Sequence, residues 1–117
     1  MSKNVVKAQE QVIDRDVKNN SDESLGIVKE IMLDKTMGRV AYLVLESGAF
    51  LWLGGKLFSI PWSAIKYNNS DDCFILDVSK DKLEKAPGFD KNNWPDMTDK
   101  QFGSTVAKYY DTTPYWE

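Results

Sequence analysis

The chain has 117 residues and a formal net charge of −3, and 42% of its residues are hydrophobic and 28% are charged. These values are typical of a single globular domain with a modest core, and they exclude a disordered chain. The acidic balance argues against nucleic acid as a partner, because phosphate binding needs clustered Lys and Arg, and no window approaches the roughly 20 apolar residues of a membrane span.

The first third of the chain predicts a flexible start and two strands. Residues 1–10 are mostly polar, and we expect them to fray. The segment 12–18 is predicted as a first strand, although its alternation of apolar and polar residues is poor. The segment 25–33 is predicted as the second strand, and the turn 34–38 ends at a glycine that can take the left-handed conformation.

The most apolar part of the chain predicts three further strands. The segment 39–46 has apolar residues on both faces, which indicates a strand covered on both sides. The run 50–53 restarts at hairpin distance, and 57–60 follows the bend at Gly54-Gly55. Pro61 cannot donate a ladder hydrogen bond, so it should end its strand or lie at a sheet edge. Short turns between such strands form an antiparallel meander, which a short chain usually curls or closes.

The last part of the chain predicts one strand and two helices. The strand is 73–78, and Ser79 is placed to cap a short helix over 80–85. Thr98 with Gln101 forms a capping-box pattern for a second helix of about three turns. The inward stripe of that helix is predicted at Phe102, Val106 and Tyr109 or Tyr110. Gly103 weakens it by roughly 1 kcal/mol relative to Ala, so the helix depends on docking.

Several short motifs, in this order and spacing, resemble the PRC-barrel family over roughly residues 12–117. They are Leu25-Gly26-Ile27-Val28-Lys29-Glu30-Ile31, Leu33-Asp34, Gly38-Arg39-Val40, Tyr42-Leu43-Val44, Phe58-Ser59-Ile60-Pro61-Trp62-Ser63-Ala64-Ile65, Ala86-Pro87-Gly88-Phe89-Asp90, Asn93-Trp94-Pro95-Asp96-Met97 and Thr113-Pro114-Tyr115-Trp116. The family includes the cytoplasmic domain of the photosynthetic reaction-centre H subunit and the C-terminal domain of a ribosome-maturation factor.

With the strand pattern, the resemblance implies a mainly β fold, a small and partly open antiparallel β-barrel of five or six strands with short C-terminal helices. We expect a flexible N-terminus over 1–10, the barrel over 11–79, and a helical and aromatic extension packed on the barrel over 80–117. The implied function is a non-enzymatic adaptor that binds a protein partner, in the cytoplasm and as a homodimer. Two alternatives stay open, a ribosome or RNA-maturation accessory factor and a regulatory subunit of photosynthetic electron transfer.

No catalytic, metal or cofactor site is predicted. The chain contains no histidine, which removes Ser-His and Cys-His catalysis and most zinc sites. Cys73 is the single thiol, it excludes an internal disulfide, and it is interpreted as a small residue at a strand end rather than a reactive group. Asp77 lies inside an apolar strand and is expected to be paired with backbone or a basic residue. Asp90 and Asp96 are expected to brace the irregular segment around them.

The remaining signal is a concentration of aromatic residues in the last quarter of the chain. The candidate interaction surface consists of Trp94, Tyr109, Tyr110, Tyr115 and Trp116. Aromatic side chains are enriched at interfaces because they bury a large area at little entropic cost. They serve equally well to hold a C-terminal segment on a small core. The sequence leaves both interpretations open, and a homodimer contact made by the tail or by an edge strand would satisfy both.

Overall fold

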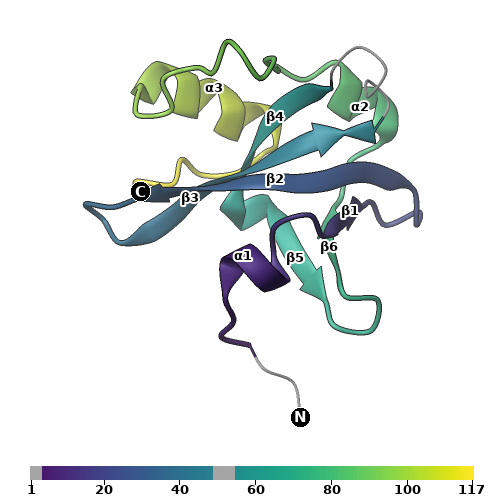
Figure 1. The fold of residues 1–117 in the computed structure, drawn as a ribbon. Helices are drawn as coiled ribbons and strands as arrows, with labels where there is room; N and C mark the ends of the chain where they lie inside the picture. The colour runs from purple at the N-terminus through teal and green to yellow at the C-terminus, as the bar shows by residue number, and fades with distance from the viewer. Residues whose placement is uncertain (1–3, 49–54) are drawn as a thin grey trace.

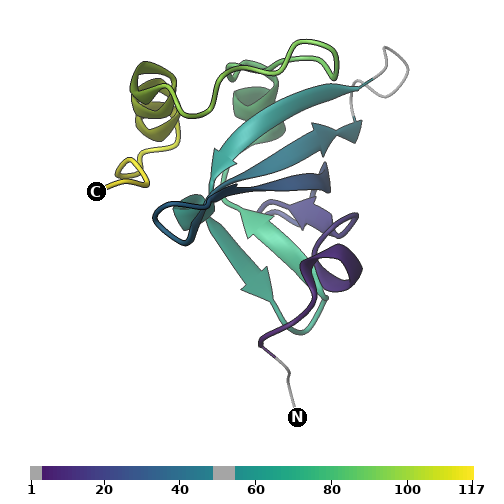
Figure 2. The ribbon, with the colours of Figure 1, turned by 60° about the vertical axis from the view of Figure 1, so that its left-hand side comes forward.

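The computed structural model describes residues 4–48 and 55–117, and its centre is one six-stranded sheet curled into a half-barrel (Figures 1 and 2). The strands lie in the order β4-β3-β2-β1-β6-β5. Their bounds are Asp16–Lys18 (β1), Ser24–Asp34 (β2), Arg39–Ser47 (β3), Lys56–Pro61 (β4), Ile65–Asn68 (β5) and Cys73–Leu76 (β6). The helices are α1 (Ala8–Gln11), the 3-10 turn η2 (Trp62–Ala64), α2 (Lys80–Glu84) and α3 (Lys100–Tyr109). This arrangement confirms the predicted mainly β, partly open barrel with short C-terminal helices.

The meander of β2, β3 and β4 is the largest unit of the sheet, and both of its pairings are antiparallel. β3 lies between the other two, and its residues from Ala41 to Leu45 are buried on both faces, as their uniformly apolar character predicts. Gly26 of β2 has φ +148°, and a Cβ there would lie 2.0 Å from the backbone oxygen of Glu46. The close approach of β2 and β3 at this point therefore requires glycine.

The other half of the sheet differs from the predicted all-antiparallel order. β5 and β6 form an antiparallel hairpin, but β6 joins the rest of the sheet by pairing in parallel with β1, Val17 opposite Phe74. The sheet is therefore mixed. β5 was not predicted as a strand, because the exposed Lys66 and Tyr67 interrupt its apolar pattern. Pro61 does lie at the end of an edge strand, as expected.

The predicted first strand is wrong over its first half. Residues 8–11 form α1, and the backbone then turns through Asp14, which has φ +71°. Only residues 16–18 are extended, as β1. Val12 and Ile13 still pack against the core, as apolar residues are expected to do, but their backbone does not form the predicted strand. The predicted strand over 50–53 lies outside the described residues.

Both predicted helices are present; α2 starts as predicted, and α3 starts one residue later than predicted. The Ser79 side chain caps α2 by accepting a hydrogen bond from the backbone N–H of Lys82. α3 is capped by Asp99 and not by Thr98, because the Asp99 carboxylate accepts from the N–H of Gln101. The Thr98 N–H instead donates to the carboxylate of Asp96. Of the helices in the described part of the chain, none has the length and hydropathy to cross a membrane.

The helices complete the core from one side of the half-barrel. Leu83 of α2 and Val106 of α3 are each 2% exposed, and both belong to the same cluster as the strand residues Leu43, Phe58 and Ile60. Figure 2 shows α2, α3 and the C-terminal segment on the β4 side of the sheet, away from the β5–β6 hairpin. The extension is therefore part of the folded unit.

Candidate functional site

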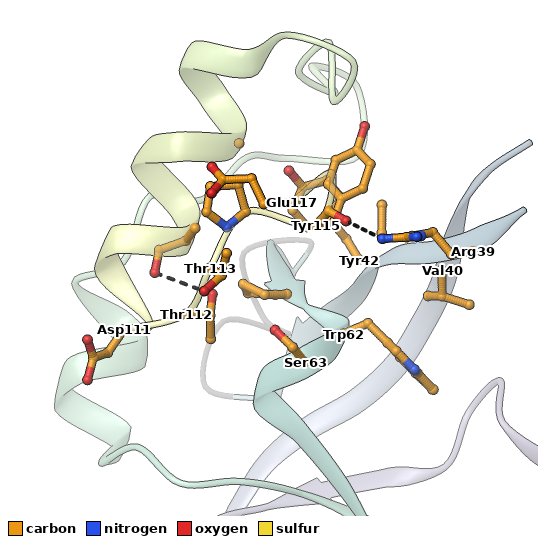
Figure 3. A pocket seen from close by; sticks show the side chains of 15 residues that line it. Arg39, Val40, Tyr42, Trp62, Ser63, Asp111, Thr112, Thr113, Tyr115 and Glu117 are labelled. Carbon is orange, nitrogen blue, oxygen red and sulfur yellow. Dashed lines mark hydrogen bonds between the residues drawn. The ribbon is translucent and has the colours of Figure 1, made fainter. Parts of the chain in front are cut away.

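The C-terminal segment lies across the end of β3 and is held there by backbone and ring contacts (Figure 3). The Arg39 guanidinium donates a hydrogen bond to the backbone oxygen of Tyr115 at 3.0 Å. The Tyr115 ring packs edge-on against Tyr42 and against Trp116, with centroids 5.6 and 5.2 Å apart. The Lys100 ammonium lies 5.6 Å from the Trp116 ring centroid. Two of the five predicted surface residues are thus packed on the chain itself, Tyr115 on β3 and Trp116 on Tyr115 and α3.

Tyr42 is the buried residue on which this packing converges. Its ring is only 2% exposed and also packs edge-on against Phe102 of α3, with centroids 6.0 Å apart. Its hydroxyl has no hydrogen-bond partner among the described residues. Burial, with a smaller contribution from Tyr115, raises the pKa of Tyr42 to about 12, because the charged phenolate would be poorly solvated.

Tyr109 and Tyr110 lie at the end of α3 and play different parts. The hydroxyl of Tyr109 donates to the backbone oxygen of Lys82, and the Lys82 ammonium lies 5.4 Å from its ring centroid, so Tyr109 ties α3 to α2. Tyr110 is a core residue at 8% exposure, and burial raises its pKa. Its hydroxyl also has no partner within the described part of the chain.

Trp94 is the exception among the predicted aromatic residues, because 40% of it is exposed. Its ring packs on Phe89 with centroids 5.2 Å apart. Phe89 in turn pairs with Leu57 of β4 through two backbone hydrogen bonds of 2.8 and 2.9 Å. Trp94 is therefore fixed in place while offering one face to solvent.

An open groove of about 670 Å³ lies between the C-terminal segment, β3 and η2 (Figure 3). Its charged lining residues are Arg39, Asp111 and Glu117, and its hydroxyl-bearing ones include Ser63 and Thr112. The Thr112 hydroxyl and N–H both donate to the backbone oxygen of Ala107, which continues the end of α3 into the groove wall. The groove therefore places hydroxyl and carboxylate side chains along the wall formed by the C-terminal segment, β3 and η2.

A second groove, of about 470 Å³, lies on the other side of Tyr115 and shares Ala41 and Tyr42 with the first. It runs between the β2–β3 turn and the segment before α3, and Met32, Met37 and Met97 line it. Methionine side chains are flexible and polarisable and adapt to differently shaped apolar partners. Leu33, at 62% exposure, and Met37, at 40%, place apolar side chains at the rim of this groove, next to the polar Lys35 and Thr36.

The structure also places the single thiol and three carboxylates for which the sequence had suggested a role, Cys73, Asp77, Asp90 and Asp96. Cys73 is buried at the start of β6, and burial raises the pKa of its thiol. β6 ends at Leu76 and Asp77 is exposed beyond it, so the prediction that Asp77 lies inside a strand over 73–78 was wrong. Asp90 accepts hydrogen bonds from Asn92 and Asn93, and the contact with Asn93 is the main reason that its pKa is lowered. Asp96 braces Thr98, as expected.

Within residues 4–48 and 55–117 no three Cys, Asp or Glu side chains are arranged to hold a metal ion. An aromatic cluster that was not predicted is formed by η2 and the β5–β6 hairpin. Phe74 lies between Trp62 and Tyr67, with ring centroids 6.3 and 5.3 Å from theirs. The three aromatic residues are evident in the sequence, but their proximity can be predicted only once residues 65–68 are known to form a strand that pairs with β6.

These features define a small half-barrel β module with a docked helical extension and two open grooves beside its C-terminal segment. A family model for the PRC-barrel domain matches residues 5–83, which is more than half of the chain. The chain therefore belongs to the PRC-barrel family. A search of curated proteins returned no matching relative.

Proposed function

We propose that the protein is a non-enzymatic interaction module, an adaptor that receives a partner protein on its surface and that itself forms a homodimer. Membership of the PRC-barrel family supports a small binding module, and the grooves beside Tyr115 supply surfaces of the size of a short peptide segment. The single buried thiol, Cys73, is consistent with a reducing compartment, and the proposal places the module in the cytoplasm.

The observation that carries the proposal is the exposure of large apolar side chains around the methionine-lined groove. Leu33 and Met37 rise from the β2–β3 turn on one side. Pro95 lines the opposite side, and the exposed Trp94 directly precedes it in the chain. Exposed apolar residues that gather around a groove mark interaction sites more often than isolated ones do. The groove is therefore the surface where we expect a partner's apolar side chains to insert.

The partner is expected to present a short segment with apolar side chains, because the methionines offer dispersion contacts. Asp34, Lys35 and Asp96 also line the groove and can bind polar groups at the edge of that segment. Of the sequence-predicted aromatic set, Tyr115 lines this groove, and Trp94 directly precedes the lining residue Pro95. The other three hold the extension together: Tyr109 binds the backbone of α2, Tyr110 is buried in the core, and Trp116 packs on Tyr115. The predicted aromatic surface is thus divided into supporting residues and residues available to a partner.

The proposal is tested with a groove variant that carries Leu33→Ser, Met37→Ser and Trp94→Ala, all at exposed positions. Affinity capture from cells that express the native or the variant chain, with quantification of the captured proteins, measures partner binding. We expect the variant to lose its most enriched partners at least ten-fold while its urea unfolding midpoint stays near that of the native chain. Met97→Leu, which conserves volume in the groove wall, is the matched control.

Two results would count against the proposal. If the same proteins are captured by the native chain and the groove variant, the methionine-lined groove is not the binding surface. If the native chain captures nothing above background and turns over a substrate or carries a bound cofactor after native purification, the module is not a simple adaptor.

A further inference from the structure

The two edge strands of the half-barrel, β4 and β5, differ in whether their outer backbone groups are paired. At the β4 edge, Leu57 exchanges two backbone hydrogen bonds with Phe89, and Pro61 ends the strand without a backbone N–H. At the other edge, β5 pairs with β6 on one side, and no segment among residues 4–48 and 55–117 pairs with its other side. An unpaired edge presents a row of backbone donors and acceptors that fits another extended strand.

β5 also carries apolar surface where such a strand would lie. Tyr67 is 45% exposed and Trp62, just before β5, is 37% exposed, and both pack against Phe74. The Tyr67 hydroxyl donates to the Asp72 carboxylate, which holds the ring in place from within the same hairpin. Asp72 is held in turn by the Arg15 guanidinium at 3.2 Å. The exposed ring is therefore already ordered before any partner arrives, which lowers the entropic cost of binding.

The charges on β5 favour one register for pairing with a second copy of itself. In an antiparallel pair, residues directly opposite point to the same face, so the two-fold axis passes beside a residue that faces its own copy. Of the four residues of β5, Lys66 and Tyr67 are the central ones, and an axis at either of them pairs the most residues. With the axis at Lys66, two ammonium groups would face each other, which is destabilising. With the axis at Tyr67, its ring meets the partner's Tyr67, and Lys66 lies opposite the partner's Asn68, which is uncharged.

We propose that two copies of this chain associate through their β5 edges, in the antiparallel register that places Tyr67 opposite the partner's Tyr67. The two half-barrels then share one continuous sheet. This inference rests on the proposed homodimeric interaction module and specifies its dimer contact. None of the residues that line the methionine-lined groove belongs to β5, so the proposed dimer contact does not use the groove's lining.

The register is tested by disulfide trapping in the full chain. Opposite residues in an antiparallel pair have Cα atoms about 4.5–5.5 Å apart, which is within the range that a disulfide bridges. Tyr67→Cys should therefore form a covalent dimer under mild oxidation at low micromolar concentration. Ser104→Cys, at an exposed position on α3, is the matched control and should remain monomeric on gels without reductant. The native Cys73 is buried and should not contribute.

Sedimentation of variants that keep the native cysteine content tests the same contact without oxidation. Tyr67→Asp places two carboxylates opposite each other and should weaken dimerisation at least ten-fold, while Tyr67→Phe keeps the ring and should leave a dimer. If the native chain is a dimer but Tyr67→Cys is not trapped faster than Ser104→Cys, the β5 contact is wrong and the dimer of the proposed function stands. If the native chain is monomeric up to several hundred micromolar, both the β5 contact and the homodimer are wrong, while the adaptor role is judged by the groove variant.

Discussion

Gly103 of α3 and Trp116 of the C-terminal segment meet so closely that no side chain fits between them. A Cβ built on Gly103 would lie 2.5 Å from the Trp116 ring and 2.9 Å from the Tyr42 hydroxyl. The glycine that weakens α3 as a helix is therefore the residue that lets the C-terminal segment lie against it. The helix loses intrinsic stability, and the docked segment gains a flat surface to pack on.

Gly103→Ala is expected to lower the free energy of unfolding by about 1 kcal/mol, although helix propensity alone favours alanine by a similar amount. The methyl group must displace the Trp116 ring, so the intrinsic tryptophan fluorescence should shift as well. Urea unfolding measures the first effect. In a Trp116→Ala background the same substitution should cost less, and a Gly103→Ala protein that is more stable than the native chain would contradict the packing described.

Gly26→Ala is expected to be far more damaging, with a loss of about 3 kcal/mol or more, because the new Cβ meets the backbone oxygen of Glu46 and φ is +148°. The adjoining strands β2 and β3 would have to separate. Gly48→Ala is the control, since no atom of the described residues lies within 4 Å of a Cβ there. Thermal unfolding followed by circular dichroism should show a large loss for the first variant and little change for the second.

Tyr42→Phe should not destabilise the protein at neutral pH and is expected to stabilise it by roughly 1 kcal/mol. The substitution removes a buried hydroxyl that has no partner among the described residues, and an unsatisfied buried donor carries a desolvation cost. Tyr109→Phe offers the contrast, since its hydroxyl donates to the Lys82 backbone oxygen, and it should lose about 1 kcal/mol. Chemical denaturation of both variants decides whether the two hydroxyls differ in this way.

The burial of Tyr42 should also make the free energy of unfolding depend on pH in the alkaline range. Its pKa is raised to about 12 in the folded protein and is about 10 in the unfolded chain. Above pH 10 the folded state holds a proton that the unfolded state has released. The associated stability is therefore complete below pH 10 and is lost as the pH rises to 12. Between these values the native chain should lose about 2–3 kcal/mol more than Tyr42→Phe. Equal losses would show that Tyr42 ionises as readily in the folded state.

The regular part of the fold was predictable because its signals are local. β2 and β3 begin and end within one residue of the predicted bounds, since alternation, turns and glycines sit within the segments themselves. α2 was found from its Ser79 cap for the same reason. The start of α3 was misplaced by one residue because Thr98 and Asp99 can both cap a helix, and the choice depends on Asp96 engaging Thr98.

The rest depended on contacts between distant segments. No local sequence pattern predicts that β1 pairs in parallel with β6. β5 has only four residues, and the exposed Lys66 and Tyr67 interrupt the apolar pattern by which a strand is predicted. The grooves likewise assemble β3, η2 and the C-terminal segment, which are separated in the sequence. The aromatic residues of the candidate site could be named in advance, but their division into supporting and exposed residues could not. That division depends on which rings line or adjoin the methionine-lined groove, and the groove is formed by segments that are distant in sequence.

The parallel pairing of β1 with β6 has a consequence for how the chain acquires its structure. The meander β2–β4 and the hairpin β5–β6 each form from contacts close in sequence, whereas the three residues of β1 join them by closing a loop that spans most of the barrel. Closing such a loop is entropically costly and slow, so this joint is expected to form late and to open early. Cooperative folding of the two halves thus depends on β1, the shortest strand. A chain in which the β1–β6 pairing is broken would contain a native β2–β4 meander and a β5–β6 hairpin that is detached from it.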